Sequence, residues 1–238
     1  MFSKKITAFT LAEVLLTLTI IGVIAALTIP ALKESSDRSA NLSLLQKAFS
    51  TSANAFAQLQ AENGPPLYWK LQDGSRVFVD GKSENVSKFF KQKMNVAAET
   101  NIIPSDYKIK SLKGTAADSF KIDDTTVKIK GNTDSFQTAD GMLWFPSNTY
   151  SGCKYSKSVT GSSSKTTVYL CGLLVVDTNG PKKPNRMGLD VFVLDITSDG
   201  VQPHNSSTDD CANLNGAGYT CAVKALSGDE RALNFIYD

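Results

Sequence analysis

The feature that most constrains this chain is an apolar run of 24 residues from Phe9 to Leu32, FTLAEVLLTLTIIGVIAALTIPAL, in which Glu13 is the only charge. A helix of this length measures about 36 Å, enough to cross a hydrocarbon core of about 30 Å. The run therefore predicts a membrane-spanning helix. Because a carboxylate inside such a helix costs about 2.5–3.5 kcal/mol, we expect Glu13 to have a partner or a specific purpose. The alternative is that Glu13 faces water at headgroup level, near Lys4 and Lys5.

The charges that flank the run predict its orientation. Lys4 and Lys5 precede it, whereas the residues that follow it carry both signs. The positive-inside rule then places residues 1–8 in the cytoplasm and the bulk of the chain outside. The rival interpretation is an ordinary secretory signal, cut near Ala25, that would release a soluble protein. A carboxylate at position 13, inside the apolar region of such a signal, argues against it.

The residues KKITA and FTLAEV, followed by the apolar run and Pro30, resemble the processing segment of type IV pilins and of type II secretion pseudopilins. The resemblance implies that prepilin peptidase cuts the leader, residues 1–8, between Ala8 and Phe9. It also implies N-methylation of the new amino terminus and pairing of Glu13 with the Phe9 amine of a neighbouring subunit. The family usually has glycine at the position of Ala8.

Elementary electrostatics favours the same role for Glu13. An ammonium at Phe9 and a carboxylate at Glu13 are each costly in a low dielectric and compensate each other when paired. Assembly of subunits would supply the pairing. Further along the run, Gly22 and Pro30 weaken a helix, so we expect local bending or melting between them.

Residues 33–62 are predicted to continue the helix with a different character. Apolar residues recur at spacings of three, four and seven, which makes one face apolar, and the opposite positions are polar. This half should lie against a sheet, and the sequence NGPP at 63–66 should end it. The apolar positions are Leu42, Leu45, Phe49, Phe56 and Leu59.

Residues 63–238 are predicted to form one extracytoplasmic globular domain with an antiparallel sheet. The expected fold class is α+β: a pilin-like long N-terminal helix packed on the sheet, with disulfide-tied loops toward the C-terminus. Residues 151–165 are rich in Ser, Thr and Gly and predict an exposed loop, and the tail from Val201 is expected to be irregular. A short helix is predicted at 84–96, and strands at 75–79, 119–122, 125–130, 135–138, 142–145, 166–176 and 189–196.

Four cysteines lie in the last third of the chain, downstream of the export segment, and disulfides are the expected state. A zinc site would need closer Cys or His pairs than the spacings of 18 and 10 found here. Four cysteines allow three connectivities. The sequence-local choice pairs Cys153 with Cys171 and Cys211 with Cys221.

The loop DTNGPKKPNRMGLD, residues 177–190, gathers side-chain oxygens on a glycine-containing turn, as calcium sites require. Asp177, Asn179 and Asp190 are its candidate ligands, and Asn185 lies in the same loop. The loop resembles those that follow a strand in pilin-like subunits, several of which bind calcium. It lacks the spacing of an EF-hand, and Asx side chains in turns commonly hydrogen-bond their own backbone, so both alternatives stay open.

Few residues suggest catalysis or nucleic-acid binding. The net charge is +2 and the basic residues are dispersed, which argues against a polyanion partner. His204, the only histidine, is predicted in an exposed loop. Asp123 and Asp124 lie on a predicted turn and should diverge. Aromatic residues that could form a glycan platform are interpreted as core residues: Trp69, Trp144 and Tyr68.

The sequence thus favours a non-enzymatic pilin or pseudopilin subunit. The partners that this implies are further subunits of the same kind, prepilin peptidase, a membrane assembly platform and membrane lipid. The subunit would sit in the inner membrane with its C-terminal domain outside until it joins a surface or periplasmic filament. One alternative is a membrane-anchored binding protein or adhesin that does not polymerise, and another is a secreted enzyme.

Overall fold

The computed structural model describes residues 10–80, 82–99, 102–122, 125–129, 134–148, 151–153, 155–159, 166–206 and 210–228. The predicted cleavage residues Ala8 and Phe9 lie outside the described residues, as do Asp123 and Asp124. Contacts divide the chain into two units, Met1–Ala40 and Asn41–Asp238. We describe each unit by itself.

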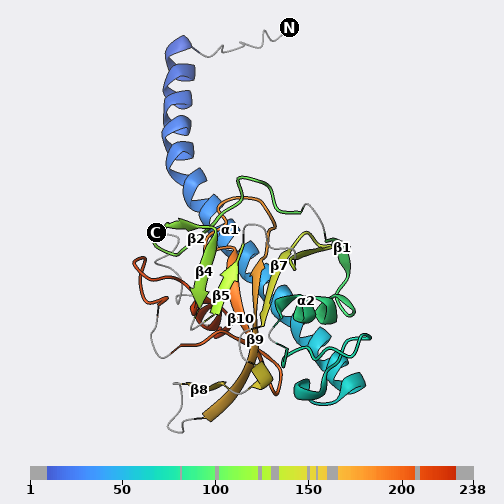
Figure 1. Ribbon diagram of the computed structural model, residues 1–238. Coiled ribbons are helices and arrows are strands. Elements are labelled where there is room, and N and C mark those ends of the chain that lie inside the picture. The colour runs from blue at the N-terminus through green and yellow to red at the C-terminus, as the bar shows by residue number, and fades with distance from the viewer. Residues whose placement is uncertain are drawn as a thin grey trace. The chain divides into compact units, whose positions relative to one another are not determined.

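The first unit contains the start of helix α1 (Leu11–Asn63), drawn in dark blue in Figure 1. The helix is unbroken through Gly22 and Pro30, so the predicted melting is wrong. A proline removes one backbone donor, and the hydrogen bonds of its neighbours can still continue the helix. The segment Leu11–Ile29 is long and apolar enough to cross a membrane, and none of it is buried. A membrane anchor and a signal sequence both meet this criterion.

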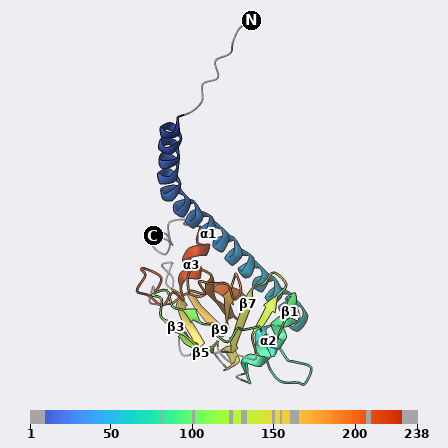
Figure 2. The same cartoon turned by 90° about the horizontal axis from the view of Figure 1, so that it is seen from above.

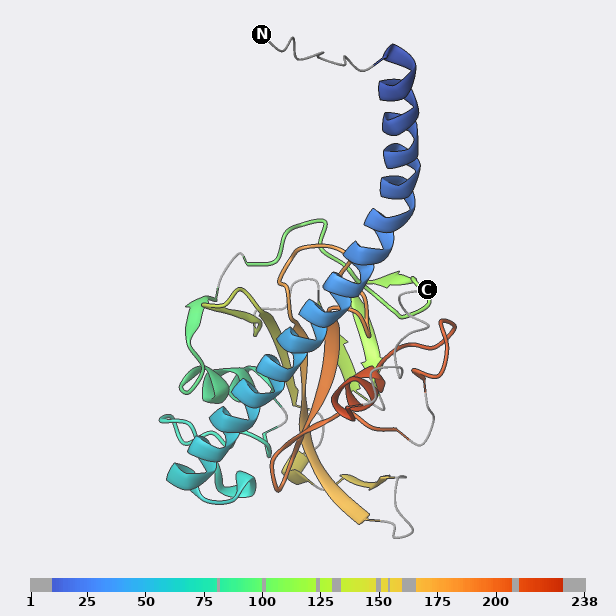
Figure 3. The same cartoon turned by 180° about the vertical axis from the view of Figure 1, so that it is seen from behind.

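The second unit begins with the amphipathic half of α1. The predicted apolar face is confirmed, because Leu45, Phe56 and Leu59 are fully buried or nearly so. Figure 3 shows this part of the helix lying across one face of the sheet. The helix ends at Asn63, where Gly64 takes a φ of 72° and its N–H donates to Gln60 O at 2.8 Å.

The central sheet is antiparallel, with the strand order β1-β6-β7-β9-β10-β11, and β8 pairs with the first half of β9. The strands predicted at 135–138, 142–145, 166–176 and 189–196 are confirmed. Short strands β1 and β11 form its edges. The strands are β1 (Val96–Ala98), β6 (Phe136–Thr138), β7 (Leu143–Asn148), β8 (Tyr155–Val159), β9 (Thr166–Asp177), β10 (Val191–Thr197) and β11 (Val201–Pro203).

Strand β9 shows how the sheet separates two apolar cores. Leu174 and Val176 point into a core shared with α1, whereas Leu173 and Val175 point into a second core on the other face. Alternate residues of a strand face opposite sides, so an uninterrupted apolar strand requires cover on both faces. The sheet is therefore the middle layer of this unit.

The first core lies under α1 and two short helices, α2 (Ser83–Lys91) and α3 (Cys221–Leu226). Trp69 is fully buried there, stacked on Phe89 with ring centroids 4.8 Å apart. Trp144 is equally buried, which confirms the core role of both tryptophans. The interpretation of Tyr68 as a core residue is wrong, because its side chain is 70% exposed. Figure 2 shows α2 beside β1 and β7.

The second core is closed by two small antiparallel sheets (Figure 1). In β4 the positions alternate, because Phe120 and Ile122 are buried and Lys121 is exposed. The fold is thus α+β, with an antiparallel sheet and an N-terminal apolar helix. The pairs are β2 (Ile109–Lys110) with β3 (Ala116–Ala117), and β4 (Ser119–Ile122) with β5 (Thr125–Lys128).

Both predicted disulfides are present. Cys153 bonds Cys171 and so ties a short 3-10 turn, Ser151–Cys153, to β9. Cys211 bonds Cys221 at the start of α3. All four sulfurs belong to the core under α1, because each cysteine is buried. The first cross-link therefore ties the 3-10 turn to the sheet, and the second closes the loop before α3.

Several local predictions are wrong. The predicted loop 151–165 contains β8, because its polar sequence pairs with β9 through backbone groups. Residues 75–79 form no strand, since Val77 and Phe78 are both buried and alternation is lost. The predicted helix 84–96 ends at Lys91, and Val96 begins β1. The tail from Val201, expected to be irregular, contains β11 and α3.

Candidate functional site

Glu13 lies in the first turn of α1, where it completes a capping box with Thr10. The Thr10 N–H donates to Glu13 Oε2 at 2.8 Å, and the Thr10 hydroxyl donates to the same oxygen at 2.9 Å. The Glu13 N–H in turn lies 3.3 Å from the Thr10 hydroxyl. The sequence T-L-A-E matches the pattern in which such pairs begin a helix. Glu13 therefore has an intrachain role that the sequence analysis missed and that the S/T-x-x-E pattern would have revealed.

The predicted ligands Asp177, Asn179 and Asp190 do come together. The register of β9 with β10 pairs Asp177 with Val191, which places both aspartates at the same end of the strand pair. Asn179 contacts both: its N–H is 3.3 Å from Asp177 Oδ1, and its Nδ2 donates to Asp190 Oδ2 at 3.1 Å. Tyr107 closes the other side, its hydroxyl 2.6 Å from Asp177 Oδ2.

Both carboxylates are completely buried. Burial raises the pKa of Asp177 well above its usual value, and the negative charge of Asp190 raises it further. Burial likewise raises the pKa of Asp190, against the hydrogen bonds from the N–H groups of Arg186 and Asn185 at 2.6 and 2.9 Å. Two carboxylates thus share a site of low dielectric, which is unfavourable for two negative charges.

Two side-chain oxygens at this site have no hydrogen-bond partner in the described part of the chain: Asn179 Oδ1 and Asn185 Oδ1, both buried. An unsatisfied buried acceptor costs free energy, so such atoms indicate a missing donor or cation. No three His, Cys, Asp or Glu side chains of the described residues gather into a metal site. The amide oxygens therefore have to complete any cation site here, and these residues fit a hard cation such as calcium.

His204 is buried, with 1% of its surface exposed, so the prediction of an exposed loop residue is wrong. Its Nδ1 lies 2.6 Å from Asp195 Oδ1 on β10. The backbone explains the burial, because His204 N donates to Val193 O at 3.0 Å and so extends the pairing of β11 with β10. The imidazole–carboxylate pair is an internal contact of the fold, and sequence reasoning missed it because the partners are not adjacent in the chain.

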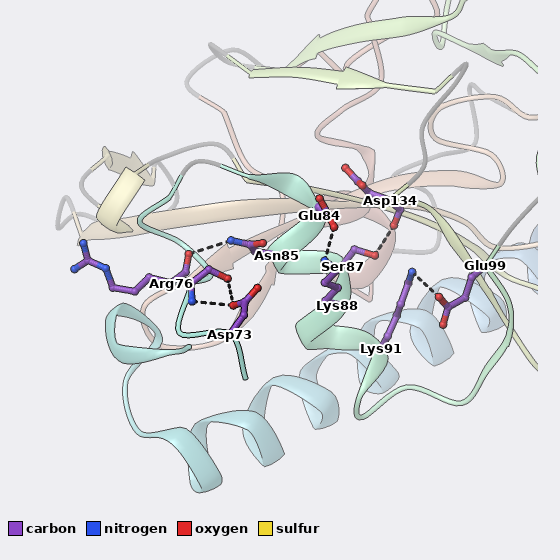
Figure 4. A network of polar contacts seen from close by, with 10 residues as sticks. Asp73, Arg76, Glu84, Asn85, Ser87, Lys88, Lys91, Glu99 and Asp134 are labelled. Carbon is purple, nitrogen blue, oxygen red and sulfur yellow. Dashed lines mark hydrogen bonds and ion pairs between the residues drawn. The ribbon is translucent and has the colours of Figure 1, made fainter. Parts of the chain in front are cut away.

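A polar groove of about 590 Å³ opens beside α2. Its acidic residues come from three separate segments and its two lysines from α2, as Figure 4 shows. Lys91 Nζ lies 3.2 Å from Glu99 and 5.7 Å from the ring of Phe136. The lining residues are Glu84, Ser87, Lys88, Lys91, Gln92, Glu99 and Asp134.

Each lysine of the groove is paired with a carboxylate. Glu84 and Lys88 form an ion pair one turn apart on α2, which lowers the pKa of Glu84 and raises that of Lys88. The Ser87 hydroxyl donates to the Asp134 carbonyl oxygen, so it is engaged in the structure of the groove. The arrangement can recognise a polar ligand that offers both donors and acceptors.

In comparisons with known proteins, no family model, no curated protein and no solved structure matches the chain.

Proposed function

We propose that the chain is a non-enzymatic structural subunit of a pilus-like filament, either a type IV pilus or a type II secretion pseudopilus. It would be cut between Ala8 and Phe9 by prepilin peptidase, held in the inner membrane by the start of α1, and moved by an assembly platform into a filament. Its partners would be membrane lipid before assembly and further subunits of the same kind afterwards.

One observation carries the proposal: the apolar segment Leu11–Ile29 has no buried residue, while residues of the same helix beyond Asn41 are packed in a folded domain. An apolar surface of this extent needs lipid or protein cover. A helix that is apolar in one half and amphipathic in the other suits a subunit that exchanges lipid for neighbouring helices. Glu13, the one charge in this segment, would meet the amine of a neighbour.

The groove beside α2 favours a second candidate function. A membrane-anchored binding protein would use the same N-terminal helix as an anchor, and its ligand would occupy this polar groove outside the membrane. Such a protein would not polymerise. The ligand class would be polar, because the groove presents two lysines and three carboxylates.

Two measurements on the native host separate these functions. Mass spectrometry of the mature chain should find an N-methylated Phe9 at its start, and a start at Met1 or near Ala26 would contradict processing as a pilin. Shearing the cells should then release the chain in filaments. A chain that begins at Phe9 and stays wholly in the membrane fraction would favour the anchored binding protein.

A further inference from the structure

One face of helix α2 forms a wall of the polar groove. The lining residues on this helix recur at the spacing i, i+3, i+4 and i+7, which places them on one side of it. They are Glu84, Ser87, Lys88 and Lys91 (Figure 4). Another face of α2 packs into the core through Val86, Phe89 and Phe90, so this wall of the groove is anchored in the fold.

The described lining residues carry one more negative charge than positive charges. The carboxylates are those of Glu84, Glu99 and Asp134, and the ammonium groups are those of Lys88 and Lys91. Each lysine is already paired with a glutamate. A further anion in the groove would therefore meet net repulsion, whereas a further cation would meet net attraction.

The lining also separates polar ligands by class. Sugar rings bind well against an open aromatic face, but Phe136 beside this groove is fully buried, with its ring centre 5.7 Å from Lys91 Nζ. A nucleic acid would bring phosphates to a lining with excess negative charge. A peptide with a basic side chain supplies a cation together with amide donors and acceptors, which is the combination that this lining favours.

Strand β1 offers an open sheet edge next to the groove. In the described part of the chain it is the first strand of the main sheet and pairs with β6 alone. Asn95 O accepts from Ala139 N at 2.8 Å. Val96 and Thr138 are therefore a non-hydrogen-bonded pair, in which the N–H and C=O of Val96 point away from β6. Asn95 and Ala97, on either side of Val96, are exposed.

The opposite edge of the sheet is protected in a way that β1 is not. Strand β11 contains Pro203, which has no N–H, and helix α3 contacts this strand. β1 has neither proline nor lysine, but it is short, and its register with β6 shifts at Ala97. Backbone pairing at Val96 would therefore orient a peptide and contribute little affinity, so the groove has to supply most of the affinity.

Glu99 connects the edge with the groove, because it lines the groove and directly follows β1. It lies three residues beyond Val96, about 10 Å of extended chain. We propose that β1 and the groove bind an extended peptide segment, whose backbone pairs with Val96 and whose lysine or arginine side chain enters the groove beside Glu99. Such a mode adds a strand to a sheet edge and recognises a side chain in a pocket. The inference rests on the second candidate function, a binding protein that uses this groove.

Fluorescence anisotropy of labelled hexapeptide libraries, titrated with the detergent-solubilised full chain, tests the proposal. In each library one position is fixed as lysine or as glutamate, and the other positions vary. We expect one position at which the lysine library binds at least about tenfold more tightly than the glutamate library, which is the scale of one charged hydrogen bond. Absence of any such position would overturn the proposal.

Glu99→Gln should abolish this preference for lysine, because it removes the charge and keeps the shape. Glu62→Gln is the matched control. Glu62 pairs with Lys93 as Glu99 pairs with Lys91, the two glutamate side chains are 56% and 54% exposed, and Glu62 lies outside the described lining. The control should keep the preference. A preference that survives in Glu99→Gln would place the peptide's cation elsewhere and overturn the assignment.

Backbone pairing with β1 is tested on the peptide, which leaves the protein intact. Two versions of the tightest-binding peptide each carry one N-methyl group, on adjacent central residues. A strand that pairs on one side directs successive N–H groups alternately toward its partner and away from it. One version should therefore lose binding while the other keeps it. Equal affinity of the two versions would overturn the pairing with β1.

A neutral oligosaccharide, maltohexaose, separates failure of this inference from failure of the function on which it rests. If maltohexaose bound, if Glu99→Gln weakened its binding, and if no peptide library bound, the peptide assignment would be overturned and the groove would remain a ligand site. Recovery of the chain in sheared filaments would count against the anchored binding protein and would leave the peptide measurements unaffected.

Discussion

Lys47 Nζ on α1 lies 3.0 Å from Asp140 Oδ2 in the turn between β6 and β7, so an ion pair joins the amphipathic helix to the sheet beneath it. Asp140 Oδ1 also accepts from the Thr138 hydroxyl at 2.6 Å. Burial alone would raise the pKa of Asp140, but the hydrogen bonds from Thr138 and Lys47 hold it below its usual value.

This contact predicts a pH-dependent contribution to stability. A carboxyl whose pKa is lower in the folded state stabilises the fold above its unfolded pKa of about 3.9, and the contribution is lost as the pH falls through the folded pKa. Asp140→Asn should therefore lower the thermal midpoint at neutral pH, and the difference from wild type should vanish at strongly acidic pH. Asp106→Asn, at an exposed position, is the control. An equal difference at both pH values would exclude the ionic origin.

The buried pair of His204 and Asp195 should be sensitive to loss of one member. His204→Ala removes the imidazole 2.6 Å from a carboxylate that is 5% exposed, and loss of a hydrogen-bond partner from a buried polar group costs about 1–3 kcal/mol. Urea unfolding measures this cost. The double variant Asp195→Leu/His204→Leu should recover much of it, because apolar replacement of both partners is often neutral. If His204→Ala were as stable as the wild type, the pair would have no structural role.

Gly180 is predicted to be irreplaceable for two separable reasons. Its φ is 72°, and a Cβ there would lie 2.4 Å from the Gly141 carbonyl oxygen in the neighbouring β6–β7 turn. Gly74 has a φ of 83°, but a Cβ there would meet no atom of the described residues within 4 Å. Gly74→Ala should therefore cost about 1–2 kcal/mol from backbone strain, and Gly180→Ala about 1–3 kcal/mol more from the clash. Equal costs in chemical denaturation would show that the two turns do not meet closely.

The parts of the fold that were predictable depend on short-range patterns. The spacing of Leu45, Phe56 and Leu59 identified the buried face of α1, because the period of a helix appears directly in the sequence. The strands at 135–138 and 142–145 were predictable as well, because the pattern of a strand also appears directly in the sequence. Local spacing also suggested the correct pairing of Cys153 with Cys171.

What escaped prediction depends on contacts between distant segments. The groove beside α2 needs Glu84, Glu99 and Asp134 to meet, and no local pattern links them. The burial of His204 follows from the pairing of β11 with β10, which composition does not reveal. The ligand candidates at Asp177 and Asp190 were an exception, because both belong to the single loop 177–190, and the pairing of β9 with β10 brings its two ends together.

Glu13 has two candidate roles, the capping box with Thr10 and the pairing with the Phe9 amine of a neighbouring subunit. The two roles predict different effects of substitution on filament assembly. Glutamine can still accept from the Thr10 N–H, so Glu13→Gln preserves the cap and removes the charge. Glu13→Ala removes both. Thr10→Ala keeps the charge and removes the capping hydroxyl, a change that costs about 0.5–2 kcal/mol of helix stability.

If Glu13 pairs with the Phe9 amine of a neighbour, Glu13→Gln and Glu13→Ala should both reduce filaments strongly, and Thr10→Ala should reduce them little. If Glu13 serves only the cap, Glu13→Gln should assemble like wild type, whereas Glu13→Ala and Thr10→Ala should share a defect. The measurement is the ratio of sheared filament to membrane-bound subunit, normalised to chains that begin at Phe9. Because loss of a charge from the apolar segment favours membrane insertion, the amount of subunit in the membrane should stay the same or rise in both Glu13 variants. A ratio unchanged in all three variants would contradict both roles of Glu13, whereas absence of sheared filament in the wild type would favour the anchored binding protein.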